Sequence, residues 1–162
     1  MSYRENVTII STSCLADGVY EMWLKTEKIA GEARPGQFIS VYSQDGSRLL
    51  PRPISICEAD KENGRLRIVY RIAGAGTKEF SAYKEGDTLD IMGPLGNGFT
   101  LLDAGTQNVI VGGGLGIPPL LELAKRLHGN TVVLLGYQDD PFMAEDFQRL
   151  GLEVHIASQS GN

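Results

Sequence analysis

The stretch Gly112-Gly113-Gly114-Leu115-Gly116-Ile117-Pro118-Pro119 decides the second half of the fold. It follows a short apolar run, 107–111, and precedes a segment, 117–128, whose apolar residues recur with helical spacing. Prolines suit the first turn of a helix, where amides have no intrahelical acceptor. A glycine loop between a strand and a helix is also where a dinucleotide pyrophosphate binds, although a proline here replaces the last glycine of the usual GxGxxG pattern. The predicted dinucleotide-binding residues are Gly112, Gly113, Gly114 and Gly116; the alternative is a turn that only packs the helix on the strand.

The segments after this loop continue the alternation of strands and helices. Residues 131–137 form a continuous apolar run typical of a buried parallel strand, 141–150 indicate a second helix, and 152–157 a third strand. The resulting βαβαβ order predicts a parallel sheet, half of a doubly wound domain. Asp139 and Asp140 follow the second strand, where an acidic residue would bind a ribose and would mildly disfavour NADP. A solvated turn explains the same pair equally well.

The chain before residue 100 has a different pattern. Short segments rich in β-branched and aromatic residues alternate with turn signals, which predicts a small antiparallel β-barrel. The predicted strands are 6–12, 19–26, 37–43, 54–58, 65–72 and 88–92, with a short helix at 76–84. We therefore predict two units: a six-stranded antiparallel barrel over residues 1–99 and a partial parallel nucleotide-binding domain over residues 100–162.

Two segments of the predicted barrel carry groups that bind anions. Arg52 and Ser55 lie three apart on a proline-stiffened segment, so the arginine could bind a phosphate while the hydroxyl donates to a ring atom. A surface arginine on an edge strand is the simpler explanation. Val69-Tyr70-Arg71 is followed by a glycine loop, residues 74–77, at the start of the short helix, where free amides could bind an anion. That loop could equally be a plain strand-to-helix turn.

Composition excludes several classes of protein. The net charge of −5 argues against a partner that is a nucleic acid or an anionic membrane. The two cysteines, Cys14 and Cys57, form no CxxC motif, which excludes a disulfide scaffold and a self-contained zinc or iron–sulfur site. The first residues lack the pattern of a secretory signal, and we expect a cytoplasmic protein.

Taken in order, these motifs resemble the ferredoxin–NADP reductase superfamily, and within it the electron-transfer subunits of NAD-dependent dihydroorotate dehydrogenases. The motifs that carry the resemblance are 35–38, 52–56, 76–77, 93–99 and 112–119. The resemblance implies a flavin-binding barrel that holds FAD, followed by a domain that binds NAD.

The resemblance also implies roles for individual residues. Arg52 would bind the FAD pyrophosphate, and Ser55 would be the catalytic residue beside the reactive flavin nitrogen. Ile54 stands where the wider superfamily usually has an aromatic residue, as expected for the dihydroorotate subgroup. The full set of implied FAD-binding residues is Arg52, Pro53, Ile54, Ser55, Val69, Tyr70, Arg71, Gly76 and Thr77.

The function implied by the resemblance is electron transfer in pyrimidine biosynthesis. Electrons from dihydroorotate would pass from FMN on a catalytic partner subunit, through a [2Fe–2S] cluster, to FAD and then to NAD⁺. Such a cluster needs four cysteine ligands, and this sequence contains two. Two alternatives remain open: a reductase subunit of a hydrogenase, sulfide or glutamate synthase system, and a truncated flavin-binding module without turnover.

Overall fold

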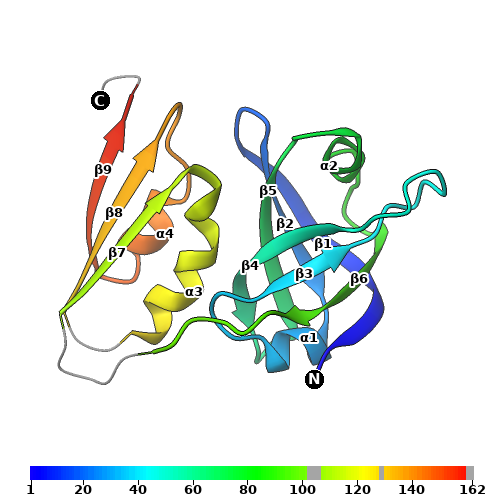
Figure 1. Ribbon diagram of the computed structural model, residues 1–162, viewed down its shortest axis with the longest axis horizontal. Helices are drawn as coiled ribbons and strands as arrows, with labels where there is room; N and C mark the ends of the chain where they lie inside the picture. The colour runs from blue at the N-terminus through cyan, green and yellow to red at the C-terminus, as the bar shows by residue number, and fades with distance from the viewer. Residues whose placement is uncertain (102–106, 128–129, 160–162) are drawn as a thin grey trace.

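The computed structural model describes residues 1–101, 107–127 and 130–159. These residues form a closed antiparallel barrel beside a three-stranded parallel sheet, which confirms the predicted fold class (Figure 1). The boundary predicted between residues 99 and 100 lies in the connection between the two units and stays a prediction. Within the described residues, we find no helix that is both long and apolar enough to span a bilayer.

Six strands build the barrel, and neighbours pair antiparallel in the closed order β1-β2-β5-β4-β3-β6. The strands are β1 (Tyr3–Ala16), β2 (Val19–Lys25), β3 (Phe38–Val41), β4 (Arg52–Asp60), β5 (Arg65–Arg71) and β6 (Thr88–Leu95). Each strand of the closed barrel pairs with a neighbour on both sides. Because side chains alternate between the interior and the exterior of a barrel, every second side chain points into one apolar core.

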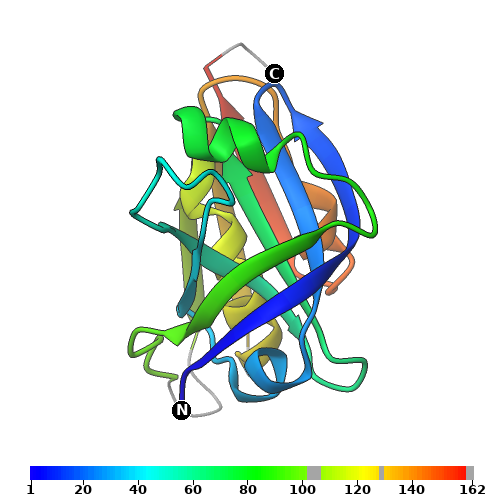
Figure 2. The same cartoon turned by 90° about the vertical axis from the view of Figure 1, so that its right-hand side faces the viewer.

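Two short helices cover opposite ends of the barrel (Figure 2). Helix α2 (Ala75–Phe80) buries Phe80 in the barrel core, and α1 (Glu27–Glu32) buries Ile29 and Ala30 in it from the other end. The sequence analysis predicted α2 but not α1. Six residues give too few apolar positions for a helical period, and the signal for α1 is its cap: the Thr26 hydroxyl accepts the Ile29 amide at 3.3 Å.

The second unit alternates strands and helices as predicted. Its elements are β7 (Asn108–Gly113), the 3₁₀ turn η1 (Gly114–Gly116), α3 (Pro118–Arg126), β8 (Thr131–Tyr137), α4 (Ala144–Gln148) and β9 (Glu153–Ser158). All strand pairs are parallel, in the order β7-β8-β9. Helices α3 and α4 cover one face of this sheet, whereas the side chains of Val109, Val111 and Leu134 on the other face are exposed.

The segment that leaves the barrel packs on a turn from its first half. The Phe99 amide donates to the Pro35 carbonyl at 2.8 Å, and the Gln37 side chain donates to the Gly96 carbonyl at 2.8 Å. Gly36 has a φ of +87°, and a Cβ there would lie 2.8 Å from the Phe99 ring. Two motifs that carried the resemblance, 35–38 and 93–99, therefore bind each other and direct the chain toward β7.

Candidate functional site

Two distant motifs meet at the start of β4. Arg52 is the first residue of this strand, and its Nη1 donates to the Leu50 carbonyl at 2.6 Å. The guanidinium lies directly against α2, since a Cβ added to Gly76 would be 2.9 Å from the Arg52 Nε. The absence of a side chain at Gly76 therefore permits the guanidinium to lie against the first turn of α2.

Thr77 organises the loop that enters α2. Its hydroxyl accepts the amides of Ala73 at 2.8 Å and Gly74 at 3.2 Å. The amides of Ala75, Gly76 and Thr77 lie in the first helical turn, where an α-helix offers no acceptor for them. A delocalised cation and several backbone donors are therefore close together, and this donor set suits a phosphate group.

The neighbouring residues of β4 alternate between the two faces of the barrel wall. Ile54 and Ile56 are buried in the barrel core, while Pro53 and Ser55 are exposed. Ser55 pairs with Phe38 of β3, so its hydroxyl is held on a paired strand and faces outward. The alternation places Ser55 on the outer face and Arg52 on the side of Ile54 and Ile56, so the Arg52 guanidinium reaches α2 at the end of the barrel and does not share a face with Ser55. Ile54 points inward and can contact a bound group only through its backbone.

The three predicted residues of β5 also point in different directions. Tyr70 points into the barrel, where its ring lies 6.2 Å from those of Tyr20 and Phe80. Val69 is buried between the barrel and the second unit, and Arg71 is exposed. The roles of all three as FAD-binding residues stay predictions.

The Tyr70 hydroxyl is a buried polar atom that finds no hydrogen-bond partner among the described residues. Burial raises the pKa of this phenol well above its usual value, so it is a neutral donor. Native proteins rarely leave such a group unpaired. The Arg52 guanidinium and the first-turn amides of α2 fit the pyrophosphate of an FAD molecule, and the outward Ser55 hydroxyl fits a polar atom of its ring. The Tyr70 hydroxyl lies inside the barrel, and its contact with a bound flavin stays a prediction.

A second site lies at the carboxyl ends of the parallel strands. A cleft of about 1060 Å³ is lined there by Gly113 and Gly114 of the glycine loop and by Asp139 and Asp140. The barrel contributes Arg71 to the same cleft, together with Asp17 from the β1–β2 hairpin. The hairpin, α2 and the carboxyl ends of β7–β9 all lie at one end of the molecule (Figure 1).

The four predicted glycines lie in three different surroundings. Gly113 and Gly114 line the cleft, and a Cβ on either would have no atom closer than 3.9 Å. Gly112 serves packing instead, since a Cβ there would be 2.6 Å from the Leu120 Cδ1. Gly116 is exposed at the end of η1. The dinucleotide-binding roles of all four stay predictions.

Sequence reasoning missed Asp17 and Tyr137 as residues that line the cleft. Asp17 lies in the turn of a barrel hairpin, and no local signal in the sequence connects that hairpin to a distant sheet. Tyr137 ends the apolar β8, and its hydroxyl donates to the Phe142 carbonyl at 2.6 Å. Burial raises the pKa of Tyr137 to about 12, so the phenol is uncharged at neutral pH. The hydroxyl therefore holds the wall of the cleft between β8 and α4.

The described residues contain no group of three or more His, Cys, Asp or Glu side chains arranged to bind a metal ion. Cys14 is exposed, and Cys57 is buried between the two units, where burial raises the pKa of its thiol far above the usual value.

Comparison with known proteins identifies the relatives of this chain. The family profile described as "Oxidoreductase FAD-binding domain" matches residues 7–99. The electron transfer subunit of dihydroorotate dehydrogenase B (NAD(+)) from Enterococcus faecalis is 42% identical over 98% of this chain and 63% of the relative. Its counterpart from Bacillus caldolyticus is 41% identical over 98% of this chain and 65% of the relative. The chain thus spans less than two thirds of the length of these curated relatives.

Solved structures show the same architecture. An NADH-dependent reduced ferredoxin–NADP oxidoreductase superposes with a TM-score of 0.87 and 29% identity, over 97% of this chain and 58% of that one. Phthalate dioxygenase reductase shares the fold, with a TM-score of 0.74 and 22% identity. The superposition covers 98% of this chain and 53% of that one. The predicted resemblance is confirmed: this chain belongs to the oxidoreductase FAD-binding domain family, has the ferredoxin–NADP reductase fold, and has dihydroorotate dehydrogenase B electron transfer subunits among its relatives.

Proposed function

We propose that this chain is the FAD- and NAD-binding part of an electron-transfer subunit that passes electrons from dihydroorotate oxidation to NAD⁺ in pyrimidine biosynthesis. The observation that carries the proposal is the contact between the Arg52 guanidinium and Gly76 at the first turn of α2. It joins two motifs that are weak alone into one donor set suited to a diphosphate. When bound, FAD supplies the redox chemistry, and the protein supplies binding, orientation and electrostatics.

Different barrel residues would bind different parts of the FAD molecule. Arg52 directs Nε and Nη2 toward α2 while its Nη1 is held by the Leu50 carbonyl, which preorients the planar fork for phosphate oxygens. Ser55, on the exposed face of a paired strand, would donate its hydroxyl to the isoalloxazine edge. The Tyr70 hydroxyl would gain the partner that it lacks among the described residues.

The cleft would bind the nicotinamide dinucleotide. Gly113 and Gly114 leave the floor open to a pyrophosphate at the entrance to α3. Three carboxylates line the cleft, those of Asp17, Asp139 and Asp140, against the single guanidinium of Arg71. A 2′-phosphate would meet this negative charge, so we propose NAD rather than NADP.

The partner in this proposal is the FMN-containing catalytic subunit of a hetero-oligomer in the cytoplasm. The names of the relatives, which are electron transfer subunits, support such a partner. The [2Fe–2S] cluster implied by the resemblance belongs to longer family members, because the two cysteines of this sequence are fewer than the four ligands required.

Absorbance spectroscopy tests the proposal. The purified chain is reconstituted with FAD, freed of unbound flavin, and titrated anaerobically with NADH and separately with NADPH. We expect a yellow protein that bleaches with NADH and responds weakly to NADPH. A yellow protein that is indifferent to NADH would identify a flavin-binding module without turnover, and failure to retain FAD would contradict the assigned site.

A further inference from the structure

The barrel and the parallel sheet meet across a joint that combines apolar and ionic contacts. Val19, Cys57 and Val69 of the barrel pack in one buried cluster with side chains of α3 and α4. Apolar contacts have little directional preference, so they hold two surfaces together without fixing their angle. The directional contacts of this joint come from charged side chains.

Glu122 makes the most buried of these contacts. It lies in the middle of α3 with 2% of its surface exposed. One carboxylate oxygen accepts the Ala59 amide of β4 at 3.1 Å, and the other accepts Arg126 at 3.1 and 3.2 Å. A buried carboxylate loses its hydration, whereas an apolar residue of similar size would keep the packing without that cost. What the carboxylate adds is a bond with a defined direction.

The backbone amide that Glu122 binds is available because of the local shape of β4. Strand β3 pairs with β4 from Arg52 to Ser55. Beyond that, a bulge between Ile56 and Glu58 shifts the register with β5 and directs Cys57 toward the second unit. The Ala59 amide then donates to Glu122, where a neighbouring strand would otherwise offer a carbonyl. Helix α3 is thus docked on a strand edge by a side-chain acceptor.

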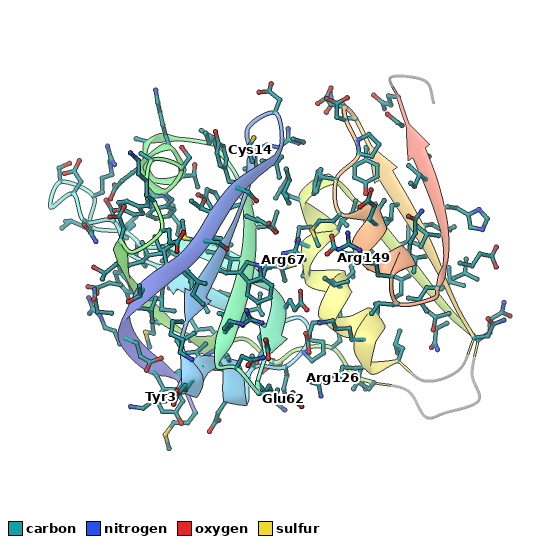
Figure 3. The ribbon with its side chains drawn as sticks, turned by 180° about the vertical axis from the view of Figure 1, so that it is seen from behind. Tyr3, Cys14, Glu62, Arg67, Arg126 and Arg149 are labelled. Atoms are coloured by element: carbon teal, nitrogen blue, oxygen red, sulfur yellow. The ribbon has the colours of Figure 1, made fainter. Side chains whose placement is uncertain are left out.

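A second ionic contact flanks the first. Arg67 of β5, whose side chain is 8% exposed, donates to Asp146 of α4 at 2.9 Å and to Glu21 of β2 at 2.7 Å. Lys125 of α3 pairs with Glu58 of β4 beside it. Arg67 and Arg126 both lie at the joint between the units (Figure 3). The two helices of the second unit are therefore each tied to a different barrel strand.

We propose that Glu122 is a positioning residue that holds the glycine loop in register with the flavin-binding end of β4. This inference rests on the proposed function, because it assigns the joint a task in aligning the two cofactor sites. Glu122 lies about 6 Å along α3 from its first residue, Pro118, at ~1.5 Å per residue. Ala59 lies about 13 Å along β4 from Ser55, at ~3.3 Å per residue.

One contact therefore links the helix that follows the glycine loop to the strand that carries Ser55. A rotation of about 10° at this contact would move groups about 15 Å away by roughly 2–3 Å, and a misplacement of about 1 Å can cost about 100-fold in a transfer step.

The test compares two substitutions of the same residue. Glu122→Gln keeps an oxygen that can accept the Ala59 amide, while Glu122→Leu keeps the volume and removes the acceptor. Glu145→Gln is the matched control, because Glu145 lies on α4 in a solvent-exposed pair with Arg149. Spin labels are placed on the exposed Cys14 of the barrel and on an introduced Glu153→Cys of β9, in a Cys57→Ala background.

The distance distribution between the two labels reports the angle of the joint without any cofactor. We expect one narrow distribution in the parent, in Glu122→Gln and in Glu145→Gln, and a broad one in Glu122→Leu. A narrow distribution in Glu122→Leu would overturn the proposal. If Glu122→Leu does not fold, Glu122→Met removes the acceptor with an unbranched, adaptable side chain and is expected to broaden the distribution. An unchanged width would again overturn the proposal.

The second readout separates positioning from binding. In Glu122→Leu we expect the affinity for FAD, whose site lies on the barrel alone, to stay within about twofold, while the maximal rate of flavin reduction at saturating NADH falls about 100-fold. A broad distance distribution with an unchanged rate would contradict the positioning role. If the parent itself is not reduced by NADH, the proposed function fails, and the label distances still decide whether Glu122 fixes the joint.

Discussion

Gly76→Ala offers a sharp test of the pyrophosphate site, because it should change stability and FAD affinity in opposite directions. An added Cβ would lie 2.9 Å from the Arg52 Nε and 3.3 Å from both Cζ and Nη2. These atoms form the far end of a flexible side chain, so the guanidinium moves and the fold stays intact. Alanine is also the better helix former by roughly 0.5–1 kcal/mol. The variant should therefore be as stable as the parent or slightly more stable.

The displaced guanidinium can no longer reach the first turn of α2. Loss of one charge-assisted hydrogen bond corresponds to about 1.5–3 kcal/mol, or roughly 10- to 150-fold weaker FAD binding. Arg52→Ala should produce a loss of the same size and Arg52→Lys a smaller one, since a lysine keeps the charge without the planar fork.

The assay is flavin fluorescence titration together with thermal melting of the FAD-free protein. Gly31→Ala is the matched control, because Gly31 also lies in a short helix and a Cβ there meets no atom within 4 Å. It should keep the parental FAD affinity. If Gly76→Ala and Arg52→Ala both bind FAD as tightly as the parent, the pyrophosphate assignment is wrong.

Three further substitutions test other parts of the site and the barrel. Ser55→Ala should slow flavin reduction by NADH far more than it weakens FAD binding, because the hydroxyl would act in the transfer step. Stopped-flow absorbance measures the rate of flavin reduction, and equal rates in the variant and the parent would leave Ser55 with a structural role only. Tyr70→Phe removes a buried hydroxyl that has no partner among the described residues, so the melting temperature of the FAD-free barrel should stay the same or rise. The same substitution should weaken FAD binding. An unchanged FAD affinity would mean that the hydroxyl does not contact the flavin. Hydrogen bonds from Arg65 and Asn63 lower the pKa of Asp60 to about 2. The contribution of Asp60 to the free energy of unfolding is therefore present above its unfolded pKa of about 3.9 and disappears as the pH falls toward 2. Asp60→Asn should reduce the pH dependence of stability in that window, and an acid transition identical to that of the parent would contradict this.

Local patterns in the sequence predicted the elements of the second unit well. The predicted range 131–137 matches β8, because a continuous apolar run between two helical segments is typical of a buried strand in a parallel sheet. Helix α1 was missed because six residues carry almost no period, and the barrel end that buries Ile29 and Ala30 cannot be seen in the local sequence.

The candidate site was less predictable, because neighbouring residues in a strand point in opposite directions. Val69, Tyr70 and Arg71 were predicted to act together, but the pleat sends Tyr70 into the barrel and the other two outward. The two outward residues then separate again, as Val69 is covered by the second unit and Arg71 reaches the cleft. Which face meets which surface depends on how the barrel closes.

The sequence by itself determined the order of the strands, the helices α2, α3 and α4, the glycine loop before α3 and the family, because each is encoded by short-range pattern and motif. Only the tertiary structure decided which distant groups meet. Arg52 lies against Gly76 because barrel closure brings the start of β4 beneath α2. Glu122 and the Ala59 amide are separated by 63 positions in the chain, yet they form a buried hydrogen bond. A glutamate in an amphipathic helix has no local signal of burial; its environment is set by the bulged edge of β4, which exists only once the sheet has closed.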